Sequence, residues 1–413
     1  MEDKKQTAIL VAVDLSKYDV EVSLKELEEL ANTAGAQVVG TMVQKRDELE
    51  KATAIGEGKV EELKQACENL GADLVIFDHE LSPSQLRNLE DAVGVSVVDR
   101  TMLILDIFAA RALTREGKLQ VELAQQKYLM PRLMGLGKSL SRLGGGIGTR
   151  GPGETKLETD RRHIRQRIEH LKKELSEMEK RRMMLRERRK KDSVITIAIV
   201  GYTNVGKSTL LNRLTNAGVL SENKLFATLD LTSRGYTLPD GREVLFVDTV
   251  GLIRRLPHHL VEAFKCTLEE AKSADLILNV ADASSPDLKE QLDVTLKVLS
   301  DIGASEISRI TVLNKCDKVE EFPHLSDETV VRISALKNEG IDDLIMAISS
   351  ALAPTHTRLK AVIPYSEGNL ISLILQNGKI YSQEYVNEGT LIDAFVDNKI
   401  LYKIQKYCGG KNE

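Results

Sequence analysis

A glycine-rich loop near the middle of the chain constrains the fold most. The loop Gly201–Ser208 reads G-x-x-x-x-G-K-S, follows the apolar run 194–200 and precedes the helical pattern 209–216. This order of strand, loop and helix is typical of a phosphate-binding loop, in which backbone N–H groups converge on phosphates at a helix N-terminus. The sequence therefore predicts an α/β domain whose mostly parallel sheet is flanked by helices.

The side chains of the loop predict nucleotide and metal binding. Lys207 can reach the β- and γ-phosphates, and Ser208 offers a hydroxyl to Mg²⁺. The loop by itself would suit ATP and GTP equally. Its predicted phosphate contacts are Gly201, Tyr202, Thr203, Asn204, Val205, Gly206, Lys207, Ser208 and Thr209.

A later motif, Asn-Lys-Cys-Asp at 314–317, predicts the base. The carboxylate of Asp317 can accept hydrogen bonds from guanine N1–H and from the exocyclic amine. Adenine lacks this donor pair and would leave the carboxylate unpaired, a mismatch of roughly several kcal/mol. The loop at 334–336 matches a segment whose backbone contacts guanine O6. The predicted guanine site comprises Asn314, Lys315, Cys316, Asp317, Ser334, Ala335 and Leu336.

Two segments between these motifs are predicted to move with the nucleotide. Asp248 is expected to hold Mg²⁺ through a water, Thr228 to coordinate it directly beside Ser208, and the Gly251 amide to meet the γ-phosphate. We predict catalytic roles for Lys207, Thr228 and Gly251. The two segments together contribute Phe226, Ala227, Thr228, Leu229, Asp230, Asp248, Thr249, Val250 and Gly251 to the predicted GTP site.

Length and hydrophobic patterning predict four parts in the 413-residue chain. Strands and helices alternate in residues 1–100, which indicates an N-terminal α/β domain with a mainly parallel sheet. Two long helical patterns, 101–128 and 157–191, each have one apolar stripe and predict an antiparallel hairpin arm over 101–192. The GTPase domain is expected at 193–355, and a small α+β domain at 356–413.

The arm carries a local excess of positive charge. Residues 156–191 contain 15 Lys or Arg against 7 Asp or Glu, although the whole chain has a net charge of −5. The predicted tip, 135–156, is rich in glycine, whose backbone can approach RNA phosphates closely, and its basic side chains attract those phosphates. A linker beside a solvated charged helix is the alternative. The RNA-contact candidates are Arg132, Lys138, Arg142, Arg150, Arg161 and Arg162.

The remaining composition indicates a cytoplasmic protein. The four cysteines lack metal-ligand spacing, which is typical of free thiols in a reducing compartment. No apolar run approaches the roughly 18 residues that a membrane span requires, so we expect no membrane insertion. We also expect a monomer, with the apolar stripes of the arm buried inside the chain.

The motifs of the arm and of the GTPase domain together resemble the HflX family of translational GTPases. The resemblance covers about residues 40–413, and its most specific parts are G-G-G-I-G-T-R-G-P-G-E-T-K-L-E-T-D-R-R at 144–162, L-I-L-D-I-F at 103–108 and G-K-L-Q-V-E-L-A at 117–124. It implies a cytoplasmic GTPase that binds the large ribosomal subunit and, in several members, splits stalled ribosomes during stress. It also implies that the arm reaches toward the peptidyl-transferase region.

The resemblance also bears on hydrolysis. Ras-like enzymes orient the attacking water with a glutamine directly after the D-x-x-G motif, where this chain has Leu252, so we expect slow intrinsic turnover that the ribosome stimulates. Arg254 and Arg255 could stabilise charge or simply lie on the surface. Asn204 matches an asparagine that in related GTPases helps to hold K⁺ beside the phosphates.

Two other functions stay open from the sequence. The first is a signalling GTPase with a protein or membrane effector, which would leave the basic arm unexplained. The second is an ATP-dependent RNA remodeller that acts through the N-terminal domain, where residues 1–100 contain no convincing phosphate loop.

Overall fold

The computed structural model describes residues 6–140, 152–191, 194–215, 226, 232–255, 269–322, 325, 329–352, 356–376 and 378–408. The chain forms two compact units. The first comprises Met1–Glu177 with the short segments Glu222–Asp230 and Arg255–Phe264, and the second comprises Met178–Ser221, Leu231–Arg254 and Lys265–Glu413. No helix among the described residues is long and apolar enough to cross a membrane.

The first unit is built on a four-stranded parallel sheet. Its strands are β1 (Thr7–Asp14), β2 (Gln37–Lys45), β3 (Leu74–Phe77) and β4 (Ser96–Asp99), in the order β2-β1-β3-β4. All pairs are parallel, and β1 is buried along nearly its whole length because helices cover both faces. The predicted N-terminal α/β domain with a parallel sheet is confirmed.

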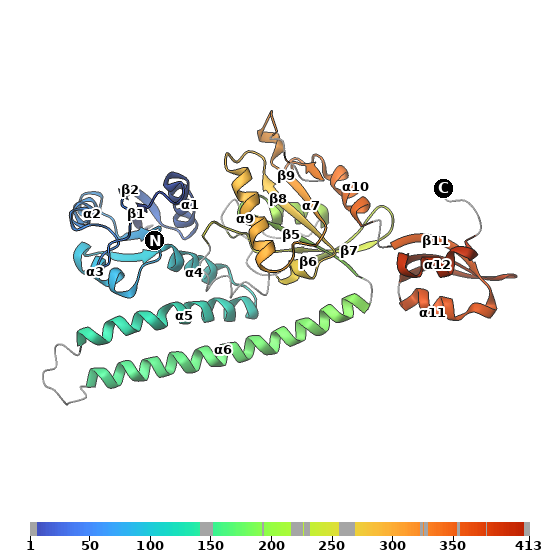
Figure 1. Cartoon of the computed structure of the whole chain (residues 1–413), viewed down its shortest axis with the longest axis horizontal. Coiled ribbons are helices and arrows are strands. Elements are labelled where there is room, and N and C mark those ends of the chain that lie inside the picture. Colours follow the sequence, from blue (N-terminus) through green and yellow to red (C-terminus); the bar gives the residue numbers. More distant parts are fainter. Residues whose placement is uncertain are drawn as a thin grey trace, which may run out of the picture. The chain divides into compact units, whose positions relative to one another are not determined.

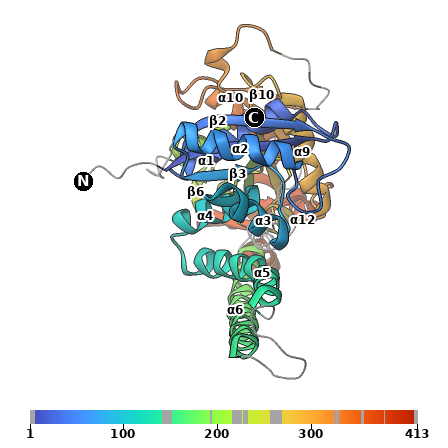
Figure 2. The same cartoon turned by 90° about the vertical axis from the view of Figure 1, so that its left-hand side faces the viewer.

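Four helices flank this sheet. They are α1 (Val20–Thr33), α2 (Glu57–Leu70), α3 (Pro83–Val93) and α4 (Arg100–Arg111). Helices α2 and α3 contact each other on one face, and α1 contacts α4 on the other (Figures 1 and 2). Local sequence sets their ends: Ser82 and Gln85 form a capping box before α3, and Gly71 and Gly94 end α2 and α3 in the left-handed conformation.

The arm is an antiparallel helical hairpin, but it begins later than predicted. Helix α4 ends at Arg111 and buries Ile104 and Phe108, so residues 100–111 pack with the N-terminal sheet instead of continuing into the arm. The hairpin consists of α5 (Arg115–Leu140) and α6 (Pro152–Lys191) (Figure 1). Both helices extend into the predicted tip 135–156, and residues 141–151 of that tip lie outside the described residues.

Ion pairs align the two helices of the hairpin. Arg167 donates two hydrogen bonds to Glu122, at 2.6 and 2.7 Å, and Arg115 donates to Glu174 at 2.7 Å. The apolar stripe of α6 is used inside the chain, since Leu171 is fully buried. Its burial explains why the apolar residues of this mostly charged helix lie along one stripe.

The second unit contains a six-stranded sheet. Its strands are β5 (Ile195–Gly201), β6 (Thr232–Thr237), β7 (Glu243–Asp248), β8 (Leu276–Asp282), β9 (Arg309–Asn314) and β10 (Val330–Arg332). The order is β10-β9-β8-β5-β7-β6, and only the β6–β7 pair is antiparallel among these strands. Helices α7 (Lys207–Thr215), α9 (Leu288–Asp301) and α10 (Ile341–Ala351) pack on it. The predicted mostly parallel sheet with flanking helices is confirmed.

A small α+β domain follows in the same unit. Strands β11 (His356–Ile363), β12 (Gly378–Val386) and β13 (Gly389–Asp397) form an antiparallel sheet in the order β11-β13-β12. Helices α11 (Asn369–Gln376) and α12 (Asn398–Ile404) and the short turns η2 (Tyr365–Glu367) and η3 (Gln405–Tyr407) accompany it. Ile374, Ile392 and Ile404 are fully buried in its core, which confirms the predicted fold class of this part.

Candidate nucleotide site

The phosphate-binding loop closes tightly between β5 and α7. Gly206 has φ 94°, and a Cβ on it would lie 2.3 Å from Nδ2 of Asn314. A Cβ on Gly201 would lie 2.1 Å from the carbonyl oxygen of Val280. Glycine is therefore required at both positions for the loop to pass so close to the neighbouring strands.

Lys207 lies buried inside this loop. Its Nζ donates hydrogen bonds to the carbonyl oxygens of Gly201, at 3.1 Å, and Tyr202, at 2.8 Å. Burial lowers the pKa of Lys207 to about 8, although the nearby carboxylate of Asp248 acts in the opposite direction. A buried cation of this kind is stabilised by an anion, so the site favours phosphate oxygens.

Ser208 and Asp248 form a hydroxyl and carboxylate pair at the end of β7. The Ser208 hydroxyl donates to Oδ2 of Asp248 at 2.9 Å, and both residues are buried. These two oxygen-bearing side chains, one at the start of α7 and one at the end of β7, fit the preference of Mg²⁺ for oxygen. Thr228, which was predicted to coordinate Mg²⁺ directly beside Ser208, lies outside the described residues, as do Ala227, Leu229 and Asp230.

The D-x-x-G segment pairs with the phosphate-binding loop through its backbone. The Leu252 amide donates to the Gly201 carbonyl at 3.1 Å, and the Leu252 carbonyl accepts from the Thr203 amide at 2.7 Å. Gly251 comes so near that a Cβ on it would lie 2.7 Å from Cγ2 of Thr203. The side chain of Leu252 is buried, and as a hydrocarbon it can neither donate a hydrogen bond to a water nor accept one.

Sequence reasoning missed the role of Tyr202. Its hydroxyl accepts a hydrogen bond from the backbone amide of Arg254 at 2.6 Å, and its backbone forms a parallel bridge with Leu252. An aromatic residue inside a glycine-rich loop was the available signal. Tyr202 therefore ties the end of the D-x-x-G segment to the phosphate-binding loop.

The two arginines after this segment have different partners. Arg254 pairs with Glu290 at 3.0 Å and Asp287 at 3.4 Å, both at the start of α9. Arg255 belongs to the first unit, where it pairs with Asp78 at 2.5 Å. Both guanidinium groups are thus engaged by carboxylates, and neither fits the simple alternative of a solvated surface arginine.

The guanine motifs are joined to the phosphate-binding loop by side-chain hydrogen bonds. Asn314 accepts from the Ala335 amide at 3.0 Å and donates to the Val205 carbonyl at 2.8 Å. Lys315, with φ 63°, donates to the Asn204 carbonyl at 2.8 Å. The base-binding and phosphate-binding parts of the site are therefore held in one arrangement.

Asp317 follows in a short 3₁₀ turn, η1 (Cys316–Lys318). Its Oδ1 accepts from the Ser334 hydroxyl at 2.8 Å, and Lys337 lies 3.9 Å from Oδ2. The Ser334 hydrogen bond holds the pKa of Asp317 below its usual value. The carboxylate is therefore charged and already oriented to accept hydrogen bonds from a base.

Arg213 was also missed from the sequence. It projects from α7 and donates to the carbonyl oxygens of Ala335, at 2.9 Å, and Leu336, at 2.8 Å. No motif marks this arginine, because its partners are backbone atoms more than a hundred positions away. It holds the loop 334–336 against the helix that begins at the phosphate-binding loop.

One described residue of the predicted GTP site lies elsewhere. Phe226 belongs to the first unit, where its buried ring packs edge-on against Phe108 with 4.6 Å between centroids. The ring of Phe226 therefore stabilises an apolar core, and its predicted contact with the nucleotide stays a prediction.

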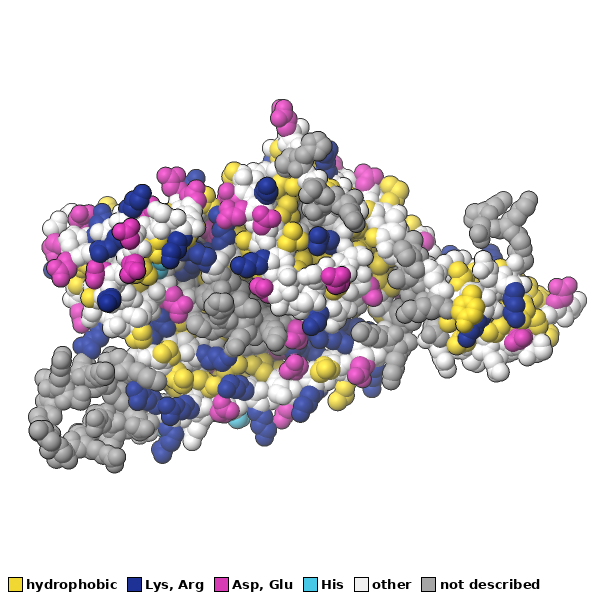
Figure 3. All heavy atoms as spheres, viewed as in Figure 1, with side chains coloured by type: hydrophobic (Ala, Val, Ile, Leu, Met, Phe, Trp, Pro, Cys, Tyr) yellow, Lys and Arg dark blue, Asp and Glu magenta, His cyan; other side chains and the backbone are white. Residues whose placement is uncertain are grey.

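The structure also gives Arg132 a different role from the predicted RNA contact. Its guanidinium lies 3.2 Å from the ring centroid of Tyr128 and pairs with buried Asp99 at 3.0 Å. Arg132 therefore stabilises the protein itself and leaves the candidate list. Arg162 is exposed and Arg161 half-buried on α6, where basic side chains follow the helix (Figure 3). The side chains of Lys138, Arg142 and Arg150 lie outside the described residues.

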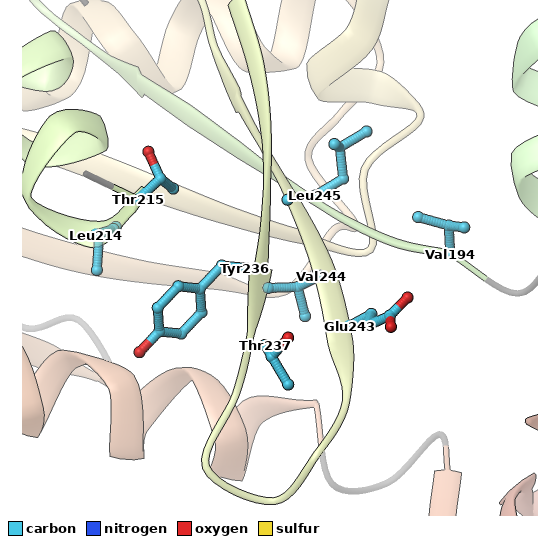
Figure 4. A pocket seen from close by; sticks show the side chains of 9 residues that line it. Val194, Leu214, Thr215, Tyr236, Thr237, Glu243, Val244 and Leu245 are labelled. Carbon is cyan, nitrogen blue, oxygen red and sulfur yellow. The ribbon is translucent and has the colours of Figure 1, made fainter. Parts of the chain in front are cut away.

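A separate pocket of about 410 Å³ lies beside α7 and the β6–β7 hairpin. Tyr236, Leu214 and Thr237 line it together with other side chains of these elements (Figure 4). Its lining includes none of the nucleotide motifs, so it is distinct from the site described above.

Three family models match successive parts of the chain. They are described as "GTP-binding GTPase N-terminal" (residues 21–109), "GTP-binding GTPase Middle Region" (111–189) and "50S ribosome-binding GTPase" (196–315). The GTPase HflX of Caldanaerobacter subterraneus subsp. tengcongensis is 53% identical over 98% of this chain and 94% of its own length. The chain belongs to the HflX family of GTPases. The GTPase HflX of Escherichia coli K12 is 42% identical over 94% of this chain and 93% of its own.

A crystal structure of a GTP-binding protein from Sulfolobus solfataricus in complex with GDP is also similar. It is 26% identical, covers 84% of this chain and 99% of that chain, and has a TM-score of 0.44. Membership of the HflX family makes this chain a GTP-binding protein and a GTP hydrolase with a P-loop domain, as the motifs predicted.

Proposed function

We propose that this HflX GTPase is Mg²⁺-dependent, acts in the cytoplasm, binds the large ribosomal subunit and splits or rescues stalled ribosomes under stress. The observation that carries the proposal is the pairing of the guanine-nucleotide site with a long basic helix, α6. The family model that matches residues 196–315 bears the description "50S ribosome-binding GTPase", which supports the same partner. The protein is proposed to act as a monomer that alternates between GTP and GDP.

The chemistry assigns a task to each group of the site. Ser208 and Thr228 would coordinate Mg²⁺ directly and Asp248 would hold it through a water, and the ion would neutralise charge on the β- and γ-phosphates. Lys207 binds the same oxygens, and the Gly251 amide donates to the γ-phosphate. Leu252 supplies nothing to the attacking water, so a ribosomal group is proposed to complete the site and to accelerate slow intrinsic hydrolysis.

The arm is proposed to bind ribosomal RNA through its phosphates. Arg162 is exposed on α6, and Arg161 lies beside it, one residue earlier. With Lys138, Arg142 and Arg150 they form the proposed contacts, which bind by counterion release and carry little base specificity. Binding should therefore weaken steeply with salt.

A potassium ion beside the phosphates is a separate proposal. It rests on Asn204, which has φ 60° in the phosphate-binding loop. A monovalent cation there would supply positive charge during hydrolysis, as an arginine finger does. Equal hydrolysis rates in matched Na⁺ and K⁺ buffers would exclude this role.

The central experiment measures GTP turnover with and without purified large ribosomal subunits, together with sedimentation against the same particles. The test variants lack Gly144–Gly153 or carry Arg161→Gln with Arg162→Gln. A matched control replaces two exposed lysines of α9, Lys289→Gln and Lys297→Gln. We expect strong stimulation of the unaltered protein, weaker and less salt-dependent sedimentation of the arginine variant, and no ribosome splitting by the deletion variant.

The opposite outcomes point to other functions. If no nucleotide state sediments with the subunits and turnover is unchanged, the signalling GTPase with a protein or membrane effector replaces the proposal. If ATP hydrolysis survives Lys207→Ala, the N-terminal domain has its own nucleotide site and the RNA remodeller is favoured.

A further inference from the structure

Thr203 in the phosphate-binding loop carries a buried hydroxyl that bonds no described residue. The residue is 5% exposed, and its Oγ1 has no hydrogen-bond partner in the part of the chain that the structure describes. Other buried threonines of the same unit are bonded: Thr249 donates to the Ile199 carbonyl at 2.8 Å. Thr295 donates to the Gln291 carbonyl at 2.9 Å. Because buried hydroxyls are nearly always bonded, that of Thr203 is available to a group that binds in this loop.

The side chain of Thr203 lies where the γ-phosphate is proposed to bind. A Cβ on Gly251 would lie 2.7 Å from Cγ2 of Thr203 and 3.1 Å from Nζ of Lys207, so one position beside Gly251 is close to both side chains. Nζ of Lys207 also donates to the carbonyl oxygen of Tyr202, the residue before Thr203. A γ-phosphate held by Lys207 and the Gly251 amide therefore lies beside the Thr203 hydroxyl, since this hydroxyl and the methyl group share one Cβ.

The backbone holds Thr203 in a fixed position. Its amide donates to the Leu252 carbonyl at 2.7 Å, and the preceding residue, Tyr202, forms a parallel bridge with Leu252. The side chain branches at Cβ, which restricts rotation about χ1. The hydroxyl is therefore held in place before the nucleotide binds. A polar group that is positioned in advance can stabilise a transition state without the cost of reorganisation.

Hydrolysis of GTP needs a polar group that orients the attacking water. The water oxygen bonds to the γ-phosphorus while the bond from this phosphorus to the β,γ-bridging oxygen breaks, and the electron pair of that bond leaves with GDP. One proton of the water stays on the attacking oxygen and the other passes to a γ-phosphate oxygen, so that the products are GDP and dihydrogen phosphate. Positioning and charge stabilisation supply nearly all of the catalysis in this reaction. Leu252 cannot orient the water, because its side chain has neither a donor nor an acceptor.

A threonine hydroxyl has the hydrogen-bonding capacity for this task. It carries one donor hydrogen and two acceptor lone pairs, so it can bond two groups at once. It can donate to a γ-phosphate oxygen and accept a hydrogen bond from the water, and it keeps its own proton throughout. The water is then held against the phosphate that it attacks.

We propose that Thr203 is a catalytic residue, whose hydroxyl bridges the γ-phosphate and the attacking water and sustains the slow hydrolysis that the chain performs without the ribosome. This role goes beyond the predicted phosphate contact of Thr203, and it rests on the proposed binding of the γ-phosphate by Lys207 and Gly251. The ribosomal group proposed above acts on a water that Thr203 already holds. All tests use the full chain without ribosomes, so a failure of ribosome binding leaves them unaffected.

The test measures single-turnover hydrolysis on protein saturated with GTP, together with the dissociation constant for GDP. Thr203→Val keeps the branched shape and the backbone hydrogen bond to Leu252 but removes the hydroxyl. We expect its hydrolysis rate to fall about 10- to 100-fold, the effect of losing one hydrogen bond to a charged group, while GDP affinity changes less than about twofold. Thr203→Ser keeps the hydroxyl with freer rotation about χ1, so its rate should stay within about fivefold of the original.

Thr295→Val is the matched control, because it removes a buried hydroxyl of α9 outside the nucleotide motifs and should leave hydrolysis unchanged. A Thr203→Val rate within about twofold of the original would overturn the proposal. So would an equal loss of GDP affinity, which indicates a structural role, or a Thr203→Ser variant as slow as Thr203→Val. Lys207→Ala tests the phosphate assignment separately. If it keeps the affinity for a β,γ-imido analogue of GTP, the γ-phosphate binds elsewhere and the role of Thr203 is excluded with it.

Discussion

Replacing Asp317 by asparagine should change the base that this GTPase prefers. The Ser334 hydrogen bond at 2.8 Å orients the carboxylate before any base arrives. The carboxylate presents two acceptors to guanine, whereas the amide of Asp317→Asn presents one acceptor and one donor. The donor would face the exocyclic amine of guanine, which is itself a donor. One hydrogen bond is lost and a repulsive contact takes its place.

The expected magnitude follows from the charge of the acceptor. A hydrogen bond to a charged group contributes about 1.5–3 kcal/mol, and the second bond also weakens when the acceptor becomes neutral. A total loss of roughly 3–5 kcal/mol corresponds to a factor of about 10²–10⁴ in affinity. Asn314 and Arg213 hold the neighbouring loops through other atoms, so the remaining site should be unchanged.

Calorimetric titration with GDP and with xanthosine diphosphate would measure the change. Xanthine carries a carbonyl where guanine carries the exocyclic amine, so the amide of Asp317→Asn can pair with it. We expect the variant to lose GDP affinity and to gain affinity for the xanthine nucleotide. Asp293→Asn, an exposed change on α9, is the matched control. A GDP loss below tenfold, or an equal loss of both nucleotides, would refute the reasoning.

Three further results are expected. Arg213→Lys keeps the positive charge but only one of the two hydrogen bonds to the loop 334–336. GDP affinity should therefore fall about three- to tenfold in the same titration. A change below twofold would contradict this expectation. Asp99→Ala removes a fully buried acceptor shared by Tyr128, Arg132 and two backbone amides. The Asp99→Ala substitution should lower the free energy that protects those two amides from hydrogen exchange by about 3–5 kcal/mol. A loss of protection below about 1 kcal/mol would count against this prediction. Burial alone would raise the pKa of Asp78, but the guanidinium groups of Arg100 and Arg255 lower this pKa below 3.8. The charged Asp78 should therefore stabilise the folded state fully at any pH above 3.8. This stabilisation should be lost only when the pH falls through the lowered pKa. Exchange protection around Asp78, corrected for intrinsic rates, should therefore be equal at pH 5 and pH 7.

The local sequence determined the fold class and the core of the nucleotide site. Apolar runs of strand length alternate with amphipathic helices and glycine stops, and this periodicity is enough to predict parallel α/β sheets. The motifs at Lys207, Asp248 and Asp317 could be assigned because each follows a strand, and parallel strands deliver their carboxyl ends to one edge of a sheet. Phosphate and guanine chemistry then leaves few residue types that serve at these positions.

Tertiary structure alone decided which charged and aromatic side chains stabilise the fold itself. The sequence reads Arg132 and Arg255 as basic residues of an arm and a switch, yet buried Asp99 and Asp78 engage them. It also reads Phe226 as part of the nucleotide site, although Phe108 provides its apolar partner. These partners lie tens to hundreds of positions away, and long-range pairing of buried charges and rings leaves no periodic signal in the chain. The role of each such side chain depends on which polar, charged or apolar groups are buried beside it when the chain folds. Only the packed structure specifies those neighbours.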